Sequence, residues 1–488
     1  SRVRSTRHRW TVRLTSVRNN GSGGRGRRGY VVAIVAVVVL AVGCASDDDD
    51  GAAPPEQTST TTNTADEVDG GTTSARPFST TEAPAPFDSF RGVTATEIEL
   101  GAIWFDSDLL AELGLSAVSF GDHGLAYRTF VDEINARGGI HGRTLVLTDE
   151  SYLPTTATEA EPLCIRLTED IGVFAVFGSF LAGSVAANEC IVGQHETAMV
   201  GGVHTAAEFD AARAPWISTL MSFQRMYPAG VELLDQEGFL DGDPRVGIVA
   251  VVDELADVES SLVPAFEAKG IEPELYELDL FIGDLIAAGG ATDVIRQRME
   301  ADGIELVVLA YGAIIRTPQD LLAAGWDTPI VSLAPNEFME TIDVLAGAPP
   351  EASDGVIGLG GLTPDEKFEL PSSQNCVATF EAANPDIEVR PVYQVPPGEP
   401  RWIVAVLSAC AEVRLFEQIA IEAGVDLTNE TFAAAAERLG DVEVPGTFAA
   451  SLGIGKYDAD DAVRLVVWDS SVGANGGIRS ISELLVVD

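Results

Sequence analysis

The sequence predicts an α/β protein made of two Rossmann-like lobes with parallel sheets. Three observations indicate this fold. Short apolar runs of strand length alternate with helical patterns, the alternation starts again in the second half of the chain, and a glycine loop follows the third strand. In open α/β sheets, ligands bind outside the carboxyl ends of the strands. We therefore expect a binding function, with two lobes facing each other across a gap.

Length and charge narrow the class of protein. The 488 residues allow two ordinary domains with flanking tails, because cores stop growing at about 250–300 residues. Residues 1–44 hold nine arginines and no acid, so the other 21 basic residues stand against all 75 acidic ones, a formal charge of −54 after Cys44. Such an acidic surface repels phosphate backbones. We therefore expect no nucleic-acid partner.

Residues 1–43 are expected to be a signal peptide. Arginines up to Arg28 precede the apolar run Tyr30–Val42. This run of roughly 13 residues is too short for a spanning helix, which needs about 20. Small residues before Cys44 and a polar segment after it resemble a bacterial lipobox, which implies cleavage before Cys44 and a lipid anchor at the extracytoplasmic face of the cell membrane. A short anchor helix with an incidental cysteine is the alternative.

Residues 44–91 are expected to form a disordered tether between the membrane and the folded part. The run Asp47–Asp50 is highly charged, and the Thr, Pro, Ala and Gly residues that follow offer little apolar surface. Such a composition cannot offset the entropy lost on ordering. The segment is therefore expected to be a solvated spacer.

Four further cysteines remain, an even number without a C-x-x-C motif. This pattern favours two disulfides over a metal or redox site. Pairing neighbours in sequence is one of three possible connectivities, and buried free thiols are the alternative. Each bridge would stabilise the fold by roughly 3 kcal/mol. The expected pairs are Cys164–Cys190 and Cys376–Cys410.

The first lobe is expected to span residues 92–219. A helix near Gly121–Arg137 carries one apolar stripe, and Gly138 can take the left-handed conformation that ends it. The chain is then expected to cross to the second lobe near Trp216–Ser222. The predicted strands of the first lobe are Ile98–Ile103, Arg143–Thr148, Val173–Phe177 and Ala198–Gly202.

The second lobe is expected at residues 220–356, with a return to the first lobe at 357–452 and a closing hairpin and C-terminal segment of the second lobe at 453–488. The other two crossings between the lobes are expected near Gly355–Leu362 and Ser451–Lys456. A long helix is expected at Trp402–Ala423. The predicted strands of the second lobe are Arg245–Val252, Glu274–Leu280, Leu306–Tyr311 and Pro329–Leu333, and its helices are Val258–Lys269, Thr292–Asp302 and Gln319–Ala324.

Several runs resemble a known family. They are GVTATEIELG from Gly92, a helix ending VDEINARGGIHGRTLVL, and the later run VFAVFGSFLAGSVAA. These are similar to the type I periplasmic binding proteins, the branched-chain amino acid (Leu/Ile/Val) class that serves ABC importers. The resemblance runs from about Gly92 to the C-terminus. It implies two lobes joined by a three-crossover hinge. The lobes are expected to close on a small-molecule ligand, a small polar metabolite such as an amino acid or a related amide or carboxylate, and to deliver it to an ABC permease in the membrane.

The candidate ligand-binding residues lie in loops after the predicted strands. Backbone N–H groups at a helix N-terminus suit a ligand carboxylate, and the resemblance implies further carboxylate-binding groups in the loop after the next strand. A plain N-cap role for Ser184 and a hydrogen-bonded loop role for His204 are the alternatives. The first loop offers an apolar surface, with core packing as the alternative for Trp104. The predicted site residues are Phe105, Asp106, Ala182, Gly183, Ser184, His204, Thr205, Asp253 and Tyr311.

The strand Leu306–Tyr311 is followed by no acidic residue. Family members that bind amino acids commonly hold the α-ammonium with a carboxylate at this place. A desolvated ammonium without an anionic partner is costly. An α-amino acid ligand is therefore in doubt, unless Asp253 or Asp106 supplies the charge.

No catalytic motif is present in the chain after Cys44, which lacks G-x-S-x-G, the P-loop, G-x-G-x-x-G and H-E-x-x-H. Asp458, Asp460 and Asp461 are spaced like part of a calcium loop, but Val463 stands where that loop needs glycine. We expect no enzyme, cofactor or metal. Two alternatives stay open: a ligand-sensing receptor domain of the same fold, and an enzyme as the weakest.

Overall fold

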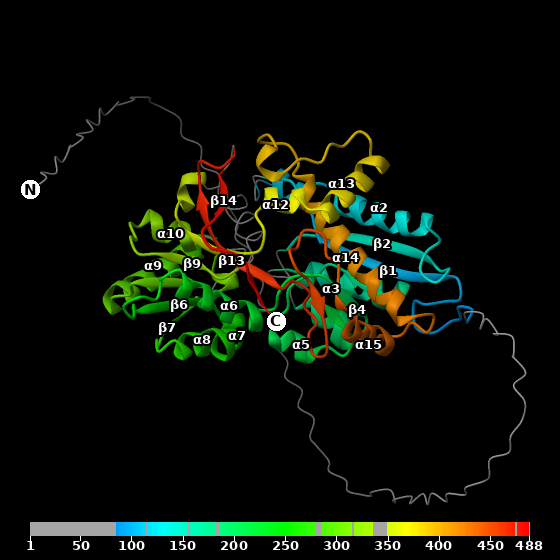
Figure 1. The fold of residues 1–488 in the computed structure, drawn as a ribbon, viewed down its shortest axis with the longest axis horizontal. Coiled ribbons are helices and arrows are strands. Elements are labelled where there is room, and N and C mark those ends of the chain that lie inside the picture. The colour runs from blue at the N-terminus through cyan, green and yellow to red at the C-terminus, as the bar shows by residue number, and fades with distance from the viewer. Residues whose placement is uncertain are drawn as a thin grey trace, which may run out of the picture. The chain divides into compact units, whose positions relative to one another are not determined.

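Five parallel strands form the sheet of the first lobe, in the order β2-β1-β3-β4-β5. Figure 1 labels β1, β2 and β4 of this sheet. The computed structural model describes residues 84–113, 116, 118–154, 157–181, 186–278, 285–314, 317–334, 349–473 and 476–487. The strands are β1 (Glu97–Phe105), β2 (Thr144–Tyr152), β3 (Ala175–Phe177), β4 (Ala198–Val200) and β5 (Trp216–Ile217).

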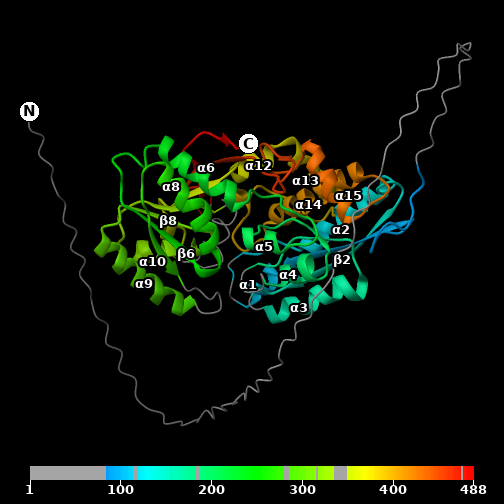
Figure 2. The same ribbon diagram turned by 90° about the horizontal axis from the view of Figure 1, so that it is seen from below.

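Helices cover both faces of this sheet, so its strands are buried on both sides (Figure 2). Successive residues of a strand point to opposite faces. In β3, Ala175 and Phe177 pack toward α2, α13, α14 and α15, whereas Val176 packs toward α3 and α4. The helices of this lobe are α1 (Ser107–Glu112), α2 (His123–Ala136), α3 (Ala157–Ile165), η1 (Arg166–Ile171), α4 (Ala187–Glu189), η3 (Cys190–Gln194), α5 (Ala206–Ala211), α12 (Pro364–Glu369), α13 (Pro371–Ala383), η8 (Val392–Gln394), α14 (Trp402–Ala423) and α15 (Asn429–Leu439).

The helix α2 follows the expected pattern. It begins after Asp122, whose side chain accepts a hydrogen bond from Leu125 N, and its apolar stripe is buried against the sheet. After the helix, Gly138 adopts a φ of +105°, a backbone conformation that suits glycine because it lacks a Cβ. The first βαβ unit was thus predicted from the sequence.

The second lobe contains the other large sheet, in the order β14-β13-β10-β9-β8-β6-β7, with β15 paired to β13. Strands β6 to β10 are parallel, and β13 runs antiparallel to β10 and β14. In β6, Ile248 and Ala250 pack toward α6 and α8, and Val249 toward α9 and α10. The strands are β6 (Val246–Val251), β7 (Glu274–Leu278), β8 (Leu306–Leu309), β9 (Ile330–Ser332), β10 (Ile357–Gly360), β13 (Ala462–Asp469), β14 (Gly477–Ser480) and β15 (Leu485–Val486).

The helices of the second lobe are mostly short and precede or follow its parallel strands. They are α6 (Phe223–Gln236), η4 (Val252–Glu254), α7 (Leu255–Asp257), η5 (Val258–Leu262), α8 (Val263–Ala268), α9 (Leu285–Asp302), η6 (Tyr311–Ile314), α10 (Thr317–Ala323) and η7 (Pro350–Ser353). A separate two-stranded ribbon, β11 (Gly440–Asp441) with β12 (Ser451–Leu452), belongs to the first lobe. Over the described part of the chain, every helix is too short or too polar to span a bilayer.

Three segments carry the chain between the lobes, as expected for a three-crossover hinge, and two of them lie side by side. Ser218 N donates to Tyr457 O at 2.8 Å, and Ala459 N donates to Ser218 O at 2.9 Å. A Cβ on Gly361 would lie 3.2 Å from Ala462 O, so the third segment is also close. The segments are 218–222 between β5 and α6, 361–363 between β10 and α12, and 457–461 before β13.

Two predicted crossings are misplaced. The run expected to return to the first lobe contains β10, which pairs with β9 and β13, so the crossing begins after Gly360 rather than at residue 357. The crossing expected at Ser451–Lys456 is a tight turn inside the first lobe, where Gly453 bridges Lys456. Short apolar runs reveal a strand but not the sheet that it joins.

The expected tether ends earlier than residue 91. Arg143 Nη2 donates to Phe87 O at 2.8 Å, and Ser89 Oγ donates to Leu427 O at 2.8 Å. The backbone of Arg143 also closes the turn that precedes β2. The chain is therefore packed on the first lobe from Phe87 onward, whereas 44–83 and the predicted signal peptide and Cys44 lie outside the described residues.

Both expected disulfides are present. Cys164–Cys190 joins α3 to η3, and Cys376–Cys410 joins α13 to α14. The bridges close loops with sequence separations of 26 and 34 residues, each worth roughly 3 kcal/mol by loop entropy. The second bridge fixes α14, which forms a wall of the site described next.

Candidate ligand-binding site

A cavity of about 300 Å³ lies between the carboxyl ends of the two sheets. From the first lobe it is lined by residues at the ends of β1, β3 and β4, among them Phe105, Ser179 and Val203. From the second lobe it is lined by Tyr311 after β8 and by residues 359–362 at the end of β10. Both sheets thus present the edge at which α/β proteins bind ligands.

After β10 the chain returns to the first lobe, and one face of its helix α14 forms a wall of the cavity. Ile403, Leu407 and Ala411 repeat at four-residue spacing and line the cavity together with the loop 444–448. In an α-helix this spacing puts side chains on one face. The wall is therefore mainly apolar, as is typical of small-molecule sites.

A carboxylic acid interrupts this apolar face. Tyr127 on α2 donates its hydroxyl hydrogen to Glu412 Oε2 at 2.5 Å, and both residues line the cavity. Burial raises the pKa of Glu412 to about 8, so the group is protonated at neutral pH. A Cβ on Gly201 would lie 2.2 Å from Glu412 Oε1, so a larger residue at this position would force the carboxyl group to shift.

Four rings form an aromatic wall at the end of β1, which we define as Trp104, Phe105, Phe120 and His123. The Trp104 and His123 ring centroids are 5.7 Å apart and stacked, and Phe105 meets Phe120 edge-on at 6.0 Å. Burial lowers the pKa of His123 to about 4, so this ring is neutral at pH 7. Among the described residues, Trp104 Nε1 and His123 Nδ1 have no hydrogen-bond partner.

Two basic side chains also line the cavity, Lys367 on α12 and Arg401 at the start of α14. Asp460, in a crossing segment, is an acidic lining residue besides Glu412. The other two lysines of the chain lie elsewhere: Lys269 follows α8 and pairs with Glu232 and Asp235, and Lys456 lies in the turn beside the crossing.

The structure places two of the predicted site residues, Phe105 and Tyr311, on the cavity wall. Asp106 is instead the N-cap of α1 and accepts a hydrogen bond from Leu109 N at 2.8 Å. Asp253 lies in η4 directly after β6, with a side chain outside the described residues. Ala182, Gly183 and Ser184 also lie outside the described residues.

The loop after β4 has a different local role from the one expected. Thr205 caps α5 by accepting a hydrogen bond from Glu208 N, and Glu208 reaches back to Thr205 N. The buried His204 ring stacks on Phe209 at 5.0 Å and meets Trp216 at 5.1 Å, and burial lowers its pKa to about 4. Neither His204 nor Thr205 is among the residues lining the cavity.

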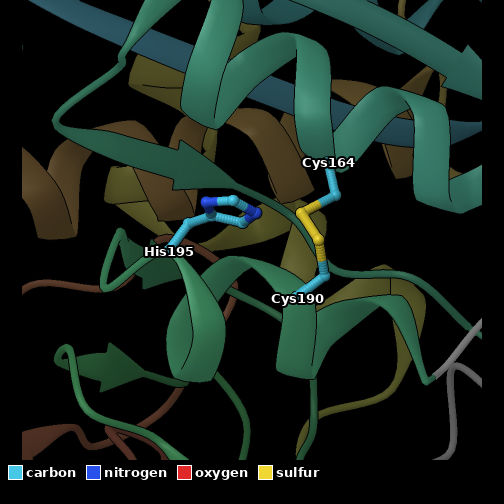
Figure 3. Close-up of side chains that lie close together, drawn as sticks. All are labelled: Cys164, Cys190 and His195. Atoms are coloured by element: carbon cyan, nitrogen blue, oxygen red, sulfur yellow. A yellow bond between two sulfur atoms is a disulfide. The ribbon is translucent and has the colours of Figure 1, made fainter.

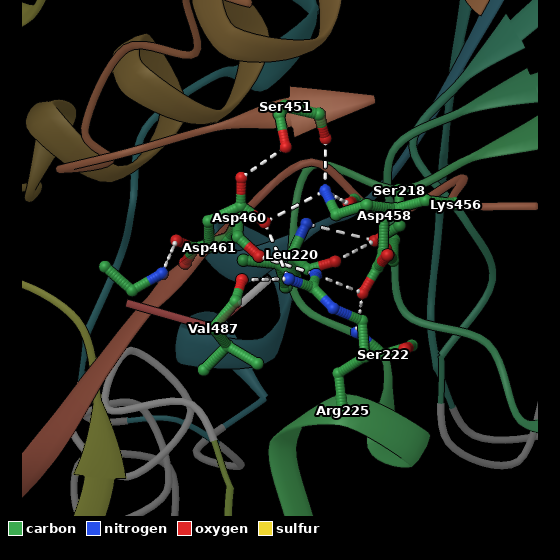
Figure 4. A network of polar contacts seen from close by, with 12 residues as sticks. Ser218, Leu220, Ser222, Arg225, Ser451, Lys456, Asp458, Asp460, Asp461 and Val487 are labelled. Atoms are coloured by element: carbon green, nitrogen blue, oxygen red, sulfur yellow. Dashed lines mark hydrogen bonds and ion pairs between the residues drawn. The ribbon is translucent and has the colours of Figure 1, made fainter. Parts of the chain in front are cut away.

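Two aspartates at the last crossing, Asp458 and Asp461, form ion pairs with basic side chains (Figure 4). Arg225 on α6 contacts Asp458 at 3.0 Å and Asp461 at 2.7 Å. Lys456 contacts Asp461 at 2.9 Å, and Ser222 N donates to Asp458 Oδ2 at 2.7 Å. The negative charges are therefore matched by protein groups, which accounts for these acids without a calcium ion.

Cys164, Cys190 and His195 bring three possible metal ligands within 4.8 Å of one another (Figure 3). Zinc and other soft metals bind cysteine as thiolate. Here both sulfur atoms are joined in a disulfide. The cluster therefore offers a metal only the imidazole of His195.

Sequence reasoning missed several polar residues of the cavity, among them Tyr127, Lys367, Arg401 and Glu412. Tyr127 belongs to the apolar stripe of α2 and was assigned to the core. Glu412 offered a signal, because it is an acid on a long, mostly apolar helix. Lys367 and Arg401 offered no such signal in the sequence, since nothing local indicates that α12 and α14 reach the carboxyl ends of the strands of the first lobe.

Comparison with known proteins identifies the fold. No protein-family model and no curated protein sequence matches the chain. Among solved structures, the chain is similar to a fatty acid ABC transporter substrate-binding protein from Thermomonospora curvata, with a TM-score of 0.56 and 16% identity over 82% of this chain and 95% of that one. The chain therefore has the type I periplasmic binding fold, as the sequence resemblance implied.

Two further structures show the same fold. A solute-binding protein of an R. palustris ABC transporter in complex with 4-hydroxybenzoate has a TM-score of 0.57 and 15% identity, covering 80% of this chain and 97% of that one. A possible leucine/isoleucine/valine-binding protein from Rhodopirellula baltica SH 1 has a TM-score of 0.54 and 16% identity, covering 81% and 98%.

Proposed function

We propose that this chain is a solute-binding protein that captures a small molecule between its two lobes and delivers it to an ABC importer. The observation that carries the proposal is the cavity lined from both sheets by the ends of their parallel strands. Structural neighbours support it, because they are ABC transporter binding proteins whose descriptions name a fatty acid, 4-hydroxybenzoate and leucine. Binding rather than catalysis also fits the absence of catalytic motifs.

Capture follows from the position of the cavity walls. A ligand that touches Phe105 in the first lobe and Tyr311 in the second stabilises the arrangement in which both are close. Only the difference in affinity between the open and closed forms can drive closure. The three adjacent crossing segments are the natural hinge, since hinge motion is absorbed by a few residues between rigid lobes.

A screen of small metabolites by thermal unfolding tests the proposal. A ligand at 100 times its dissociation constant is expected to add about 2.7 kcal/mol to the free energy of unfolding. Tyr311→Ala should reduce the response to the best compound, whereas Tyr276→Ala, on the outer strand β7 and away from the cavity, should not. If no compound raises the unfolding midpoint, the proposed function fails. If the protein binds a ligand but its partner is a signalling protein rather than a permease, the receptor alternative would be favoured.

We further propose that Cys44 is lipidated and holds the protein at the extracytoplasmic face of the membrane. The support is the apolar run Tyr30–Val42 followed by small residues and cysteine. Cys44→Ala is expected to move the full chain from the membrane fraction to the soluble fraction of a bacterial host. Cys44→Ser controls for the side chain and should behave the same way. Retention of both variants in the membrane fraction would contradict lipidation.

A further inference from the structure

We infer that the ligand is a small carboxylate with an aromatic or aliphatic body and no α-ammonium group, held with its body against the aromatic wall and its charge toward Lys367 and Arg401. The inference rests on the proposed function and names the chemical class of its ligand. It is argued from the residues that line the cavity.

The apolar part of the ligand follows from the walls. The aromatic wall lies on one side of the cavity, and Ile403, Leu407 and Ala411 line it from α14. Met221 and Met226 add adaptable apolar surface near the crossing. A strongly polar ligand such as a sugar would leave its hydroxyl groups unpaired against these walls, which is unfavourable.

The negative charge follows from the balance of lining residues. Lys367 and Arg401 are positive, and Glu412 is protonated at pH 7 because burial raises its pKa to about 8. Asp460 is the remaining acidic lining residue among those described, and its carboxylate accepts a hydrogen bond from Ala462 N. Lys367 and Arg401 also have other partners, and the inference needs only their charge at the wall. The balance thus favours an anion over a cation.

Trp104 indicates where a ligand acceptor belongs. Trp104 lines the cavity, and its indole N–H is a buried donor without an acceptor among the described residues. Buried donors are normally paired, so an unpaired one calls for an explanation. An oxygen of a bound carboxylate or phenol would satisfy it. A protonated Glu412 offers a second donor in the same cavity, because a neutral carboxyl group can donate as well as accept.

An α-amino acid would need an ionised partner for its ammonium group. Glu412 is neutral at pH 7 and already bonded to Tyr127, and Asp106 caps α1. Asp460 accepts a hydrogen bond from Ala462 N, and the side chain of Asp253 lies outside the described residues. Burying an unpaired ammonium beside Lys367 adds like-charge repulsion to desolvation. The structure thus favours the acid over the corresponding amino acid.

The test compares pairs of compounds that differ only in the α-ammonium group. Calorimetric titration of the full chain at pH 7 would use 3-phenylpropanoate against L-phenylalanine, and 4-methylpentanoate against L-leucine. We expect the acid of at least one pair to bind about 10-fold or more tightly than its amino acid, since an unpaired buried charge costs more than 1.4 kcal/mol. Tighter binding of the amino acids would overturn the inference and leave the proposed function standing.

Two matched substitutions locate the contacts. Trp104→Phe keeps a ring but removes the N–H, and it should weaken binding of the acid about 5-fold to 10-fold. Trp326→Phe is the control, because its Nε1 is also a buried atom without a hydrogen-bond partner among the described residues but is not among the lining groups. Equal effects of the two substitutions would remove Trp104 from the site.

Lys367→Met should weaken the binding of 3-phenylpropanoate about 10-fold, because it removes the positive charge that faces the carboxylate. The affinity for the neutral 3-phenylpropanamide should not change. Lys269→Met, on the outer surface of the second lobe, should change neither. An equal loss for acid and amide would show that Lys367 acts by packing and would overturn its charge role. If neither pair binds but the metabolite screen finds another ligand, the inferred class is wrong; if the screen finds nothing, the proposed function itself fails.

Discussion

Replacing Arg225 by methionine is expected to lower the free energy of unfolding by about 3–5 kcal/mol, because it strips a buried ion-pair network of its central cation. The Asp458 and Asp461 side chains are only 5% and 9% exposed. Lys456 still reaches Asp461, whereas among the described residues Asp458 keeps only its hydrogen bond from Ser222 N. An uncompensated buried carboxylate would thus remain at the crossing between the lobes (Figure 4).

The measurement is denaturant unfolding of Arg225→Met beside Arg245→Met. Arg245 lies 3.8 Å from Glu274, and the two side chains are 57% and 59% exposed. Exposed pairs of this kind contribute about 0–1 kcal/mol. Equal midpoint shifts for the two variants would show that the crossing network does not stabilise the fold.

Glu412→Gln is expected to make the protein more stable than the unmodified chain, by an amount that grows as the pH rises. The pKa of Glu412 is about 8 in the folded protein and near its ordinary value of 4.5 when unfolded. Between these values the folded state holds a proton that the unfolded state has released, so stability is lost as pH rises through this window. Each pKa unit corresponds to about 1.4 kcal/mol, so the total difference is on the order of several kcal/mol.

Unfolding midpoints at pH 5 to 9 give this comparison directly. Tyr127→Phe removes the hydrogen bond but keeps the carboxyl group, so it must retain the pH dependence. Burial lowers the pKa values of the two histidines His123 and His204 to about 4. Their contribution to the free energy of unfolding is therefore lost as pH falls below 6.5, a pH dependence opposite in sign to that of Glu412. Both histidines are present in every variant, so their contributions cancel when the stability of a variant is compared with that of the unmodified chain. Parallel curves for Glu412→Gln and the unmodified chain would contradict the expectation.

The sequence was sufficient where local chemistry decides the structure. The helix Trp402–Ala423 has the predicted bounds because an uninterrupted helical run ends at Gly424, whose φ is +84°. The two disulfides join the expected cysteines because these lie only 26 and 34 residues apart in sequence and the helices that carry them pack against each other, α3 against η3 and α13 against α14. The two lobes followed from the repeated alternation of strand and helix.

The site was less predictable because it is assembled across distant segments. Tyr127 meets Glu412 over 285 positions of sequence, and no local pattern reports such a contact. Thr205 was expected at the ligand, but the Glu208 three residues later makes it a helix cap. A capping box is visible in sequence, and giving it more weight would have corrected that assignment.

The scarcity of lysine has a practical consequence for labelling. The chain holds three lysines, at the outer surface of the second lobe, at the cavity and at the turn beside the crossing. An amine-reactive reagent followed by peptide mass mapping would therefore report on three separate regions of the molecule at once. Protection of Lys367 alone by an added compound would mark occupancy of the cavity without any engineered probe.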